Sequence, residues 1–499
     1  MLFQFGRGNA FMAVFIIGVL MISRVQSLLI DPASIAPHWE NVHYLRSIDL
    51  TRGYVRETDL IEIKNIDSKP QREYTFTIND GFEVVPKVSI LAVSLVDKAI
   101  EVEPTSIGKN IFKFKLPFPI APNQNVEIKV RYIYTNALTP LPAKIAMDEK
   151  QNLLAKLNKL PYSPYPTKEY SLTFTGLLKG QEMQLNLPNL DEIKASSDYN
   201  VPSTLKPRVE DKSLKYGPII DDIPSFSIEP MGLLYEHNRP IAKVNNLQRS
   251  IWLPASGVDQ LSIEEYYELT NDAAELSSGF SRVDYMKGRY EHIRKHFSIS
   301  HLEIPLTSNR NFDDYYYTDH VGVVSTHQVA QNHLILQPRF PIFGGWNYNF
   351  TLGWNNKFSD FVHKVLDQED TYIIKVPLLN TVRDVFYDNA YINFYLPENA
   401  EFVNVSSPID FESVNVDNEL SYLDVSKGHV KVTVHFKDLI DDLHKLDLFV
   451  SYKYTPSHYW TKVLKIAAFA FVGLTSYYLI GLIDISIDKE HKSVVEENN

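Results

Sequence analysis

The chain has 499 residues, a formal net charge of −12 and no cysteine. The acidic balance argues against a nucleic-acid binder or a polybasic membrane-surface protein, because anionic partners attract basic surfaces. Without cysteine there is no thiol catalysis, no cysteine zinc site and no disulfide, so burial alone must hold the fold together. A chain of this length fits two or three domains better than a single core.

The N-terminus has the layout of a secretory signal. An apolar run over residues 11–22 follows Arg7, and no acidic residue precedes it. A basic start, an apolar stretch of roughly 7–15 residues and a small-residue exit are typical of such signals. We therefore predict a signal peptide over residues 1–27, cleaved at Ser27. The alternative is an uncleaved N-terminal anchor.

The segment between the signal and the C-terminal region is predicted to be mainly β. Apolar and polar residues alternate in several stretches, which is the period-2 pattern of half-buried strands; these are residues 111–116, 126–134, 430–436 and 446–454. Pro, Asn, Asp and Gly recur between such stretches, as β-sandwiches require. The expected fold is two β-sandwich-like domains with a few short helices.

A domain boundary is expected near residues 200–245, where X-Pro steps repeatedly interrupt the chain. We place the first lumenal β-rich domain at residues 28–235 and the second at 236–456. Within the second domain, residues 262–274 and 285–296 have the composition of short helices.

A nearly uncharged run over residues 463–483 predicts a transmembrane helix. About 20 apolar residues suffice to cross a hydrocarbon core of about 30 Å. With a cleaved signal, this helix would be a single type I anchor that leaves residues 484–499 as a cytosolic tail. Residues 456–461 would join the last strand to the anchor, and their aromatic side chains suit the membrane interface. Gly473 and Gly481 offer a small face for packing against partner helices, although a helix that faces only lipid is also possible.

No catalytic motif is apparent. A phosphate-binding glycine loop, a nucleophile elbow and the HExxH motif are all absent, and we predict no catalytic residue, no metal and no cofactor. His292 and His296 have the i, i+4 spacing of helical metal ligands, but a third ligand is not evident. We interpret them as part of an ordinary polar helix face.

Three pairs of adjacent acids could bind cations or do acid/base work, but solvated turns are the simpler interpretation; the pairs are Asp221-Asp222, Asp313-Asp314 and Asp441-Asp442. The second pair opens a stretch with three tyrosines that ends at Asp319. This stretch fits a packed strand better than a sugar-binding or peptide-binding face.

Two sequons, Asn349-Phe-Thr and Asn404-Val-Ser, are candidate N-glycosylation sites on exposed loops of a translocated chain. A further segment, residues 338–346, contains Gly344-Gly345 among aromatic residues. Glycine tolerates backbone angles and close contacts that a Cβ forbids, so this pair predicts a tight turn packed under aromatic rings.

Several stretches together resemble the ribophorin I family, the type I membrane subunit of the endoplasmic-reticulum oligosaccharyltransferase. The resemblance is carried by WENVHYLRSIDLT at residues 39–51, YSPYPT at 162–167, and YYTDHVGVVST at 316–326 followed by LQPRFPIFGGW at 336–346. It spans the whole ectodomain and the anchor. Animal-type members carry a long cytosolic domain after the anchor, whereas the short tail here resembles the fungal form.

The resemblance implies a non-catalytic subunit of a complex that transfers a preassembled oligosaccharide from dolichyl diphosphate to the asparagine of nascent sequons. The implied partners are the catalytic subunit and other accessory subunits, nascent polypeptides and the endoplasmic-reticulum membrane, with no nucleic acid. The implied role is complex assembly and acceptor presentation, with the ectodomain in the lumen. Two alternatives share this topology: a membrane-tethered glycosidase or hydrolase that uses Asp313 or Asp319, and a cell-surface adhesion ectodomain.

Overall fold

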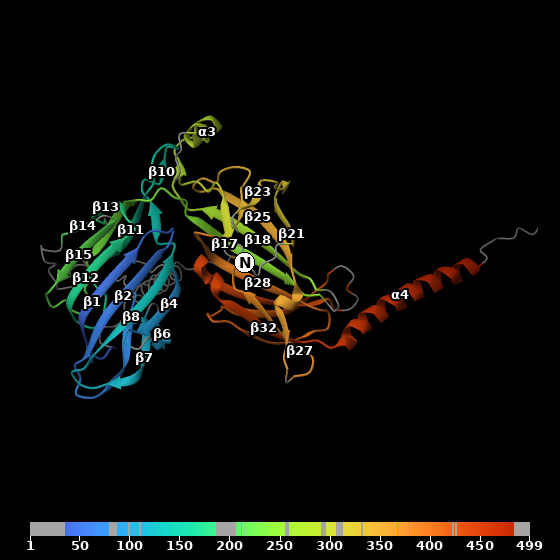
Figure 1. Ribbon diagram of the computed structural model, residues 1–499, viewed down its shortest axis with the longest axis horizontal. Helices are drawn as coiled ribbons and strands as arrows, with labels where there is room; N and C mark the ends of the chain where they lie inside the picture. Colours follow the sequence, from blue (N-terminus) through green and yellow to red (C-terminus); the bar gives the residue numbers. More distant parts are fainter. Residues whose placement is uncertain are drawn as a thin grey trace, which may run out of the picture.

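Two β-rich bodies lie side by side, and one long helix projects from the second (Figure 1). The computed structural model describes residues 35–483, apart from 79–86, 98–99, 109–110, 186–205, 211, 255–258, 291–295, 306–312, 331–332, 367, 381, 422–423 and 425–426. The predicted signal peptide with Ser27 and the predicted tail over 484–499 therefore lie outside the described residues. A mainly β fold with one C-terminal apolar helix is confirmed.

The first unit contains an eight-stranded sheet, faced by smaller sheets. The large sheet has the order β14 (Arg208–Glu210), β15 (Ser213–Ile219), β12 (Thr167–Thr175), β1 (Trp39–Asp49), β2 (Val55–Asn65), β8 (Asn125–Thr135), β4 (Lys87–Leu95) and β5 (Ile100–Val102). A four-stranded sheet has the order β13 (Leu178–Met183), β16 (Pro230–Glu236), β11 (Asn152–Asn158) and β9 (Leu138–Pro140). A three-stranded sheet has the order β3 (Gln71–Thr77), β7 (Ile111–Ile120) and β6 (Pro104–Gly108).

The second unit is built in the same way. Its large sheet has the order β22 (Gly322–Val323), β21 (Asp313–Asp319), β25 (Asn347–Asn356), β18 (Leu261–Asn271), β17 (Ala242–Trp252), β28 (Val385–Leu396), β31 (His429–Ile440) and β30 (Ser413–Glu419). A four-stranded sheet has the order β26 (Val362–Lys364), β27 (Thr371–Pro377), β32 (Asp447–Lys453) and β29 (Glu401–Ser406). A three-stranded sheet has the order β20 (Leu302–Pro305), β24 (His333–Leu336) and β23 (His327–Ala330).

The helical elements are few. They are α3 (Arg282–Tyr290), α4 (Pro456–Leu482) and the short 3₁₀ turns η3 (Phe358–Asp360) and η4 (Asp441–Lys445). A two-residue pairing of β10 (Lys144–Ile145) with β19 (Glu275–Leu276) connects the two units. Among the described strands it is the only pairing that crosses between β1–β16 and β17–β32. We therefore propose that the domain boundary lies at residues 237–241, next to the predicted boundary at 235/236.

The predicted strands form where the apolar alternation is regular. In β8, Val126, Ile128 and Val130 point into the core, while the charged residues between them lie at the surface. The stretches 111–116 and 430–436 likewise fall in β7 and β31, and the stretch 446–454 exceeds β32 by one residue at each end. Each alternate residue thus buries apolar area, which stabilises by about 25 cal/mol per Å² removed from water.

The helix predicted over residues 262–274 is wrong, because these residues fall largely in β18. Leu261, Ile263, Tyr267 and Leu269 alternate into the core in a strand period, and the inward position between them holds Glu265. An inward-facing glutamate broke the expected apolar pattern. The helix predicted over 285–296 is found in part, as α3, and residues 291–295 lie outside the described part of the chain.

The two units repeat one plan around a central hairpin. β1 pairs with β2 antiparallel and with β12 parallel, and β17 pairs with β18 antiparallel and with β28 parallel. Each hairpin has a β-bulge at the same place, between Asn41 and His43 in β1 and between Val244 and Asn246 in β17. Because β-bulges are specific features of a fold, their equivalent positions support a shared plan for the two units.

A buried arginine occupies the same position of both hairpins. Arg46 lies three residues after the first bulge and is in register with Asp59, while Arg249 lies three residues after the second and is in register with Glu265. Both guanidinium groups donate to a backbone carbonyl at the end of a strand in the facing sheet, Asn158 in β11 and Pro377 in β27. The arginine therefore ties the two layers of each sandwich together.

In the first unit, the buried cation Arg46 lies beside two carboxyl groups, those of Glu57 and Asp59. Arg46 forms an ion pair with Glu57, and Tyr44 donates a 2.8 Å hydrogen bond to Asp59. Burial, reinforced by the neighbouring Glu57, raises the pKa of Asp59 well above its usual value, although Arg46 acts against this shift. A protonated Asp59 leaves the buried cluster electrically neutral, which avoids an uncompensated buried charge.

This arrangement predicts a pH effect at Asp59. The folded-state pKa of Asp59 is raised above the unfolded value of about 3.9, so the folded chain keeps a proton that the unfolded chain releases above that pH. Stability from this group is therefore full below about pH 4 and declines as pH rises toward the folded-state pKa. The amide of Asp59→Asn does not titrate, so this variant lacks the decline. As the pH rises above about 4, the free energy of unfolding of the variant should increase relative to that of the parent by up to about 1.4 kcal/mol per pH unit.

Urea unfolding of the two proteins between pH 4 and pH 8 measures this difference. Glu101→Gln, at an exposed position of the edge strand β5, is the control and should track the parent. Parallel curves for Asp59→Asn and the parent would contradict the assignment of the proton.

Candidate functional site between the two units

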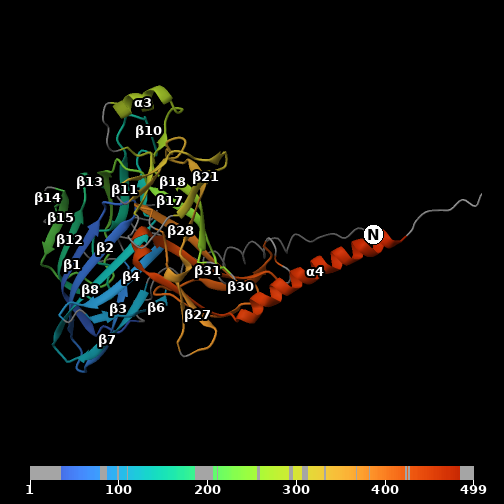
Figure 2. The ribbon, with the colours of Figure 1, turned by 45° about the vertical axis from the view of Figure 1, so that its right-hand side comes forward.

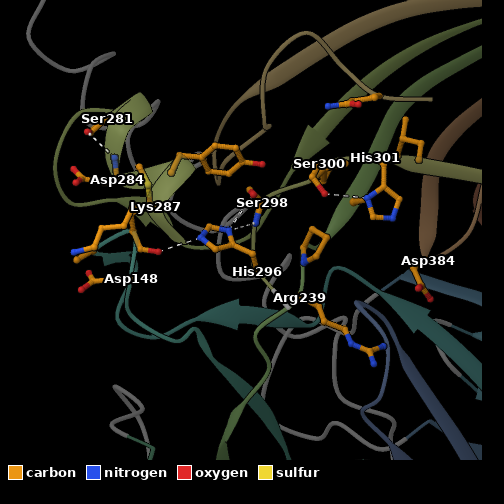
Figure 3. Close-up of a pocket in the computed structure, with 18 of the residues that line it drawn as sticks. Asp148, Arg239, Ser281, Asp284, Lys287, His296, Ser298, Ser300, His301 and Asp384 are labelled. Carbon is orange, nitrogen blue, oxygen red and sulfur yellow. Dashed lines mark hydrogen bonds between the residues drawn. The ribbon is translucent and has the colours of Figure 1, made fainter. Parts of the chain in front are cut away.

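A cleft of about 1080 Å³ opens between the units beneath α3 (Figure 3). The first unit contributes the turn at Ala146, Met147 and Asp148, and the connecting segment contributes Arg239. The second unit contributes one face of α3 and the edge strand β20 with the residues before it. These segments are far apart in the sequence, so the cleft exists only once both units have folded.

His296 lies at the centre of this cleft as a neutral ring. Its Nε2 is 3.0 Å from the carbonyl oxygen of Met147, and the backbone N–H of Ser298 donates to its Nδ1 over 3.1 Å. Nε2 therefore carries the proton. Burial lowers the pKa of His296, and the hydrogen bond to Met147 opposes this only in part. His296 thus links the two units and is not free to act as a cation.

The cleft walls carry both signs of charge beside apolar surface. Arg239 and Lys287 are exposed on opposite sides, and Asp148 and Asp284 lie near Lys287 (Figure 3). Glu303 and Arg383, both exposed, also line the cleft and form a 3.5 Å ion pair. The apolar part of the lining includes Met147, Ile299 and Ile335. Such a mixed surface suits a flexible chain of mixed composition better than a single small anion or cation.

One junction beside the cleft is apolar. Ile145 of the first unit packs with Ala273, Ala274, Phe297 and Phe343 of the second, next to the β10–β19 pairing. The buried side chain of Gln151 crosses the boundary as well. Its Oε1 accepts from Ala274 N–H at 2.7 Å, and its Nε2 donates to the His237 carbonyl at 2.9 Å.

The tight turn predicted at Gly344-Gly345 belongs to this junction. A Cβ on Gly344 would lie 2.1–2.2 Å from the carbonyl oxygens of Ala274 and Ala273, which leaves no space for any side chain. Gly345 has φ +76°, a conformation that glycine adopts without strain. Phe343, Trp346 and Phe280 surround the turn with rings, so the expectation from the sequence is confirmed.

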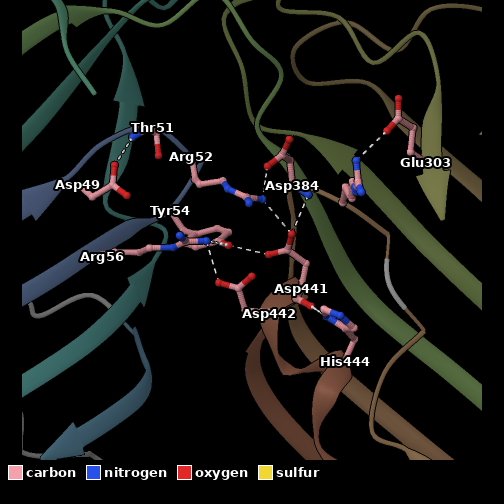
Figure 4. A network of polar contacts seen from close by, with 11 residues as sticks. Asp49, Thr51, Arg52, Tyr54, Arg56, Glu303, Asp384, Asp441, Asp442 and His444 are labelled. Carbon is pink, nitrogen blue, oxygen red and sulfur yellow. Dashed lines mark hydrogen bonds and ion pairs between the residues drawn. The ribbon is translucent and has the colours of Figure 1, made fainter. Parts of the chain in front are cut away.

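A second junction is polar (Figure 4). Asp441, at the start of η4, accepts from the Tyr54 hydroxyl at 2.6 Å, from Arg52 at 3.0 Å and from the Asp384 N–H at 2.9 Å. Arg56 reaches Asp442 at 2.8 Å. Burial, with the nearby Asp441 carboxylate, raises the pKa of Tyr54, so the phenol stays protonated as a donor. Asp441 is buried and is not the solvated turn that the sequence suggested.

The other acid pairs form no site among the described residues. Asp222 is exposed and pairs with Lys168 at 3.1 Å, as expected of a solvated turn. In β21, Tyr317 is fully buried and its hydroxyl lies 2.7 Å from that of Tyr348, which agrees with a packed strand. Asp319 is paired with Arg339 at 2.6 Å.

His292 lies outside the described residues, so the spacing with His296 is not tested. Within the described part of the chain, no cluster of three or more His, Asp or Glu side chains is arranged to hold a metal.

The sequons lie in strands, so the prediction of exposed loops is wrong. Asn349 is the third residue of β25, where its half-buried amide donates to the Tyr266 hydroxyl at 3.1 Å. Asn404 is exposed on the edge strand β29, where the register shifts between Phe402 and Asn404. Outward positions of strands are polar, as loops are, so composition alone did not distinguish the two.

The C-terminal helix α4 fulfils the length and composition of a membrane span over Ser457–Leu482. Nothing packs within 4 Å of the Cβ position of either Gly473 or Gly481. The proposed packing face is therefore open in the chain by itself.

Comparison with known proteins identifies the family. The ribophorin I family model matches residues 39–481. This chain belongs to the ribophorin I family. The resemblance drawn from the sequence motifs is thereby confirmed, and it covers both β-rich units and most of α4.

Two relatives of the family span nearly the whole chain. Dolichyl-diphosphooligosaccharide–protein glycosyltransferase subunit 1 of Schizosaccharomyces pombe is 25% identical over 454 residues, covering 89% of this chain and 95% of the relative. The subunit 1 of Caenorhabditis elegans is 24% identical over 471 residues, covering 92% of this chain and 75% of the relative. Among solved structures, an M1 zinc metallopeptidase of Deinococcus radiodurans is 14% identical, covers 50% of this chain and 52% of its own, and has a TM-score of only 0.25, too low to carry an argument.

The polar junction predicts that substitutions of two adjacent acids, Asp441 and Asp442, lower the free energy of unfolding by different amounts. Asp441→Asn should lower the free energy of unfolding by about 1–3 kcal/mol, because the buried carboxylate that accepts from Arg52 and Tyr54 is lost while Arg52 keeps its ion pair with Asp384. Asp442→Asn alters an exposed ion pair and should change it by less than about 1 kcal/mol. Urea unfolding of both variants measures the difference, and equal losses would show that the junction contributes no more than a surface pair.

Proposed function

We propose that this chain is an accessory subunit of an oligosaccharyltransferase complex in the endoplasmic-reticulum membrane, with its two β-rich units in the lumen. The observation that carries the proposal is the family match over residues 39–481, joined to relatives named as subunit 1 of the dolichyl-diphosphooligosaccharide–protein glycosyltransferase. The reaction that this complex catalyses is N-glycosylation of asparagine in sequons of nascent proteins.

The chain contributes structure rather than chemistry to that reaction. A lipid diphosphate needs a cavity at the membrane, and a single span such as α4 cannot enclose one. Buried charged groups in the described part of the chain, such as Arg46 and Asp441, bind other side chains of the fold. We assign glycosyl transfer itself to a different subunit.

The cleft is the surface that we assign to acceptor polypeptides. Its walls combine the exposed charges of Arg239 and Lys287 with apolar patches, and the edge strand β20 lines it. An extended peptide fits such a wall because its backbone and its varied side chains both find partners. The cleft would thus hold acceptor chains while a neighbouring subunit modifies them.

Purification of the tagged full chain from detergent-solubilised microsomes should recover other oligosaccharyltransferase subunits in stoichiometric amounts. Transfer to an acceptor peptide should accompany that complex and should be absent from the isolated chain. Recovery of the chain without other subunits, or transfer by the isolated chain, would overturn the proposal. In the complex, a photoreactive group at Arg239 should crosslink to a nascent sequon-containing chain, whereas one at Arg208, exposed on β14, should not.

The sequons test the lumenal orientation. Asn404 lies exposed at a sheet edge, so we expect it to carry a glycan in most molecules, and half-buried Asn349 to carry one in a minority. Mass spectrometry after enzymatic glycan removal, which converts each modified Asn to Asp, measures both occupancies. Ser406→Ala and Thr351→Ala are the controls that abolish each sequon. An unmodified Asn404 would contradict a lumenal ectodomain.

A further inference from the structure

The start of α4 is part of the second unit and not a separate linker. β32 ends at Lys453, and the helix begins three residues later at Pro456. The sequence suggested a joining stretch over residues 456–461, but these residues are helical and continuous with the membrane span. Tyr459 packs against the apolar core of the ectodomain, and the rings of Tyr454 and His458 are 5.9 Å apart. Figure 2 shows α4 leaving the second unit as one unbroken helix.

Lys462, in the second turn of α4, reaches into an acidic recess of the second unit. Its Nζ lies 2.7 Å from Asp424 and 3.4 Å from Glu398. The side chain of Asp424 is fully buried and that of Glu398 is 3% exposed. Surface ion pairs contribute little, but a pair that is removed from water and then broken leaves an uncompensated charge and costs several kcal/mol.

Both acids belong to the second unit, and Asp424 also has partners outside the helix. Asp424 accepts from the Ser421 N–H at 2.8 Å, and its carboxylate lies 3.6 Å from Nε2 of His429. Glu398 lies in the turn between β28 and β29, where Asn399 has φ +69°. Two acids that are distant in the sequence of the second unit therefore meet at Lys462, which lies within the first two turns of α4.

We propose that Lys462, Asp424 and Glu398 form an ionic mount that holds the membrane helix at one fixed angle to the second unit. The ectodomain then does not swing on a flexible tether. Because the two units are joined at an apolar and a polar junction, the mount also sets the direction in which the whole ectodomain stands on the membrane. This inference does not depend on the identity of the complex.

The chain has no cysteine, so two introduced cysteines label it uniquely. Spin labels at Gln248→Cys, exposed on β17, and Leu474→Cys, exposed on α4, report the distance between ectodomain and helix by double electron–electron resonance on the full chain in lipid nanodiscs. The parent should give one narrow distance distribution. Lys462→Met should broaden it at least twofold.

Lys465→Met is the matched control, since Lys465 lies one turn further along the same helix and is exposed. Its distribution should match the parent. If Lys462→Met impairs folding, as a thermal melt of the ectodomain would reveal, the double variant Lys462→Met with Asp424→Asn removes one charge from each side and should broaden the distribution as well. A broad distribution in the parent, or a narrow one in a folded variant lacking Lys462, would overturn the proposal.

Discussion

The fold depends on a cation buried in the central hairpin of each sandwich. Arg46 and Arg249 occupy equivalent positions, face a carboxylate on the paired strand and donate to a strand end of the opposite sheet. Without disulfides, a layered β protein must fix the register of its sheets by packing and by directional bonds. A guanidinium held by bonds to both layers specifies one register, because a shift of one residue would point it at solvent.

The same motif reveals an internal repeat that the sequence did not. Besides the arginine, both hairpins end at a buried asparagine, Asn65 and Asn271, whose amide donates to two backbone carbonyls. Glu265 of the second unit replaces Asp59 of the first. The two units share too few residues for the repeat to be detected in a single sequence. It becomes apparent only when the strand pairing aligns the equivalent positions.

The sequence predicted the strands with regular alternation, the apolar anchor and the turn at Gly344, because each of these follows from local pattern. It failed where tertiary context decides. Glu265 points inward in β18 because Arg249 neutralises it, and Asp441 is buried because Arg52 and Tyr54 approach it from another unit. The cleft could not be predicted, since its walls come from residues as far apart in the sequence as Met147 and Arg383. The family resemblance, in contrast, rests on whole motifs and needed no geometry.

The length of α4 has a consequence for how the protein sits in bilayers of different thickness. Its first two turns belong to the second unit, so about 20 residues remain, which span about 30 Å and match an average hydrocarbon core. A free helix adapts to a thinner or thicker bilayer by tilting. A helix bound at its base to a rigid body tilts that body too, so the local lipid composition would change the elevation of the cleft above the headgroups.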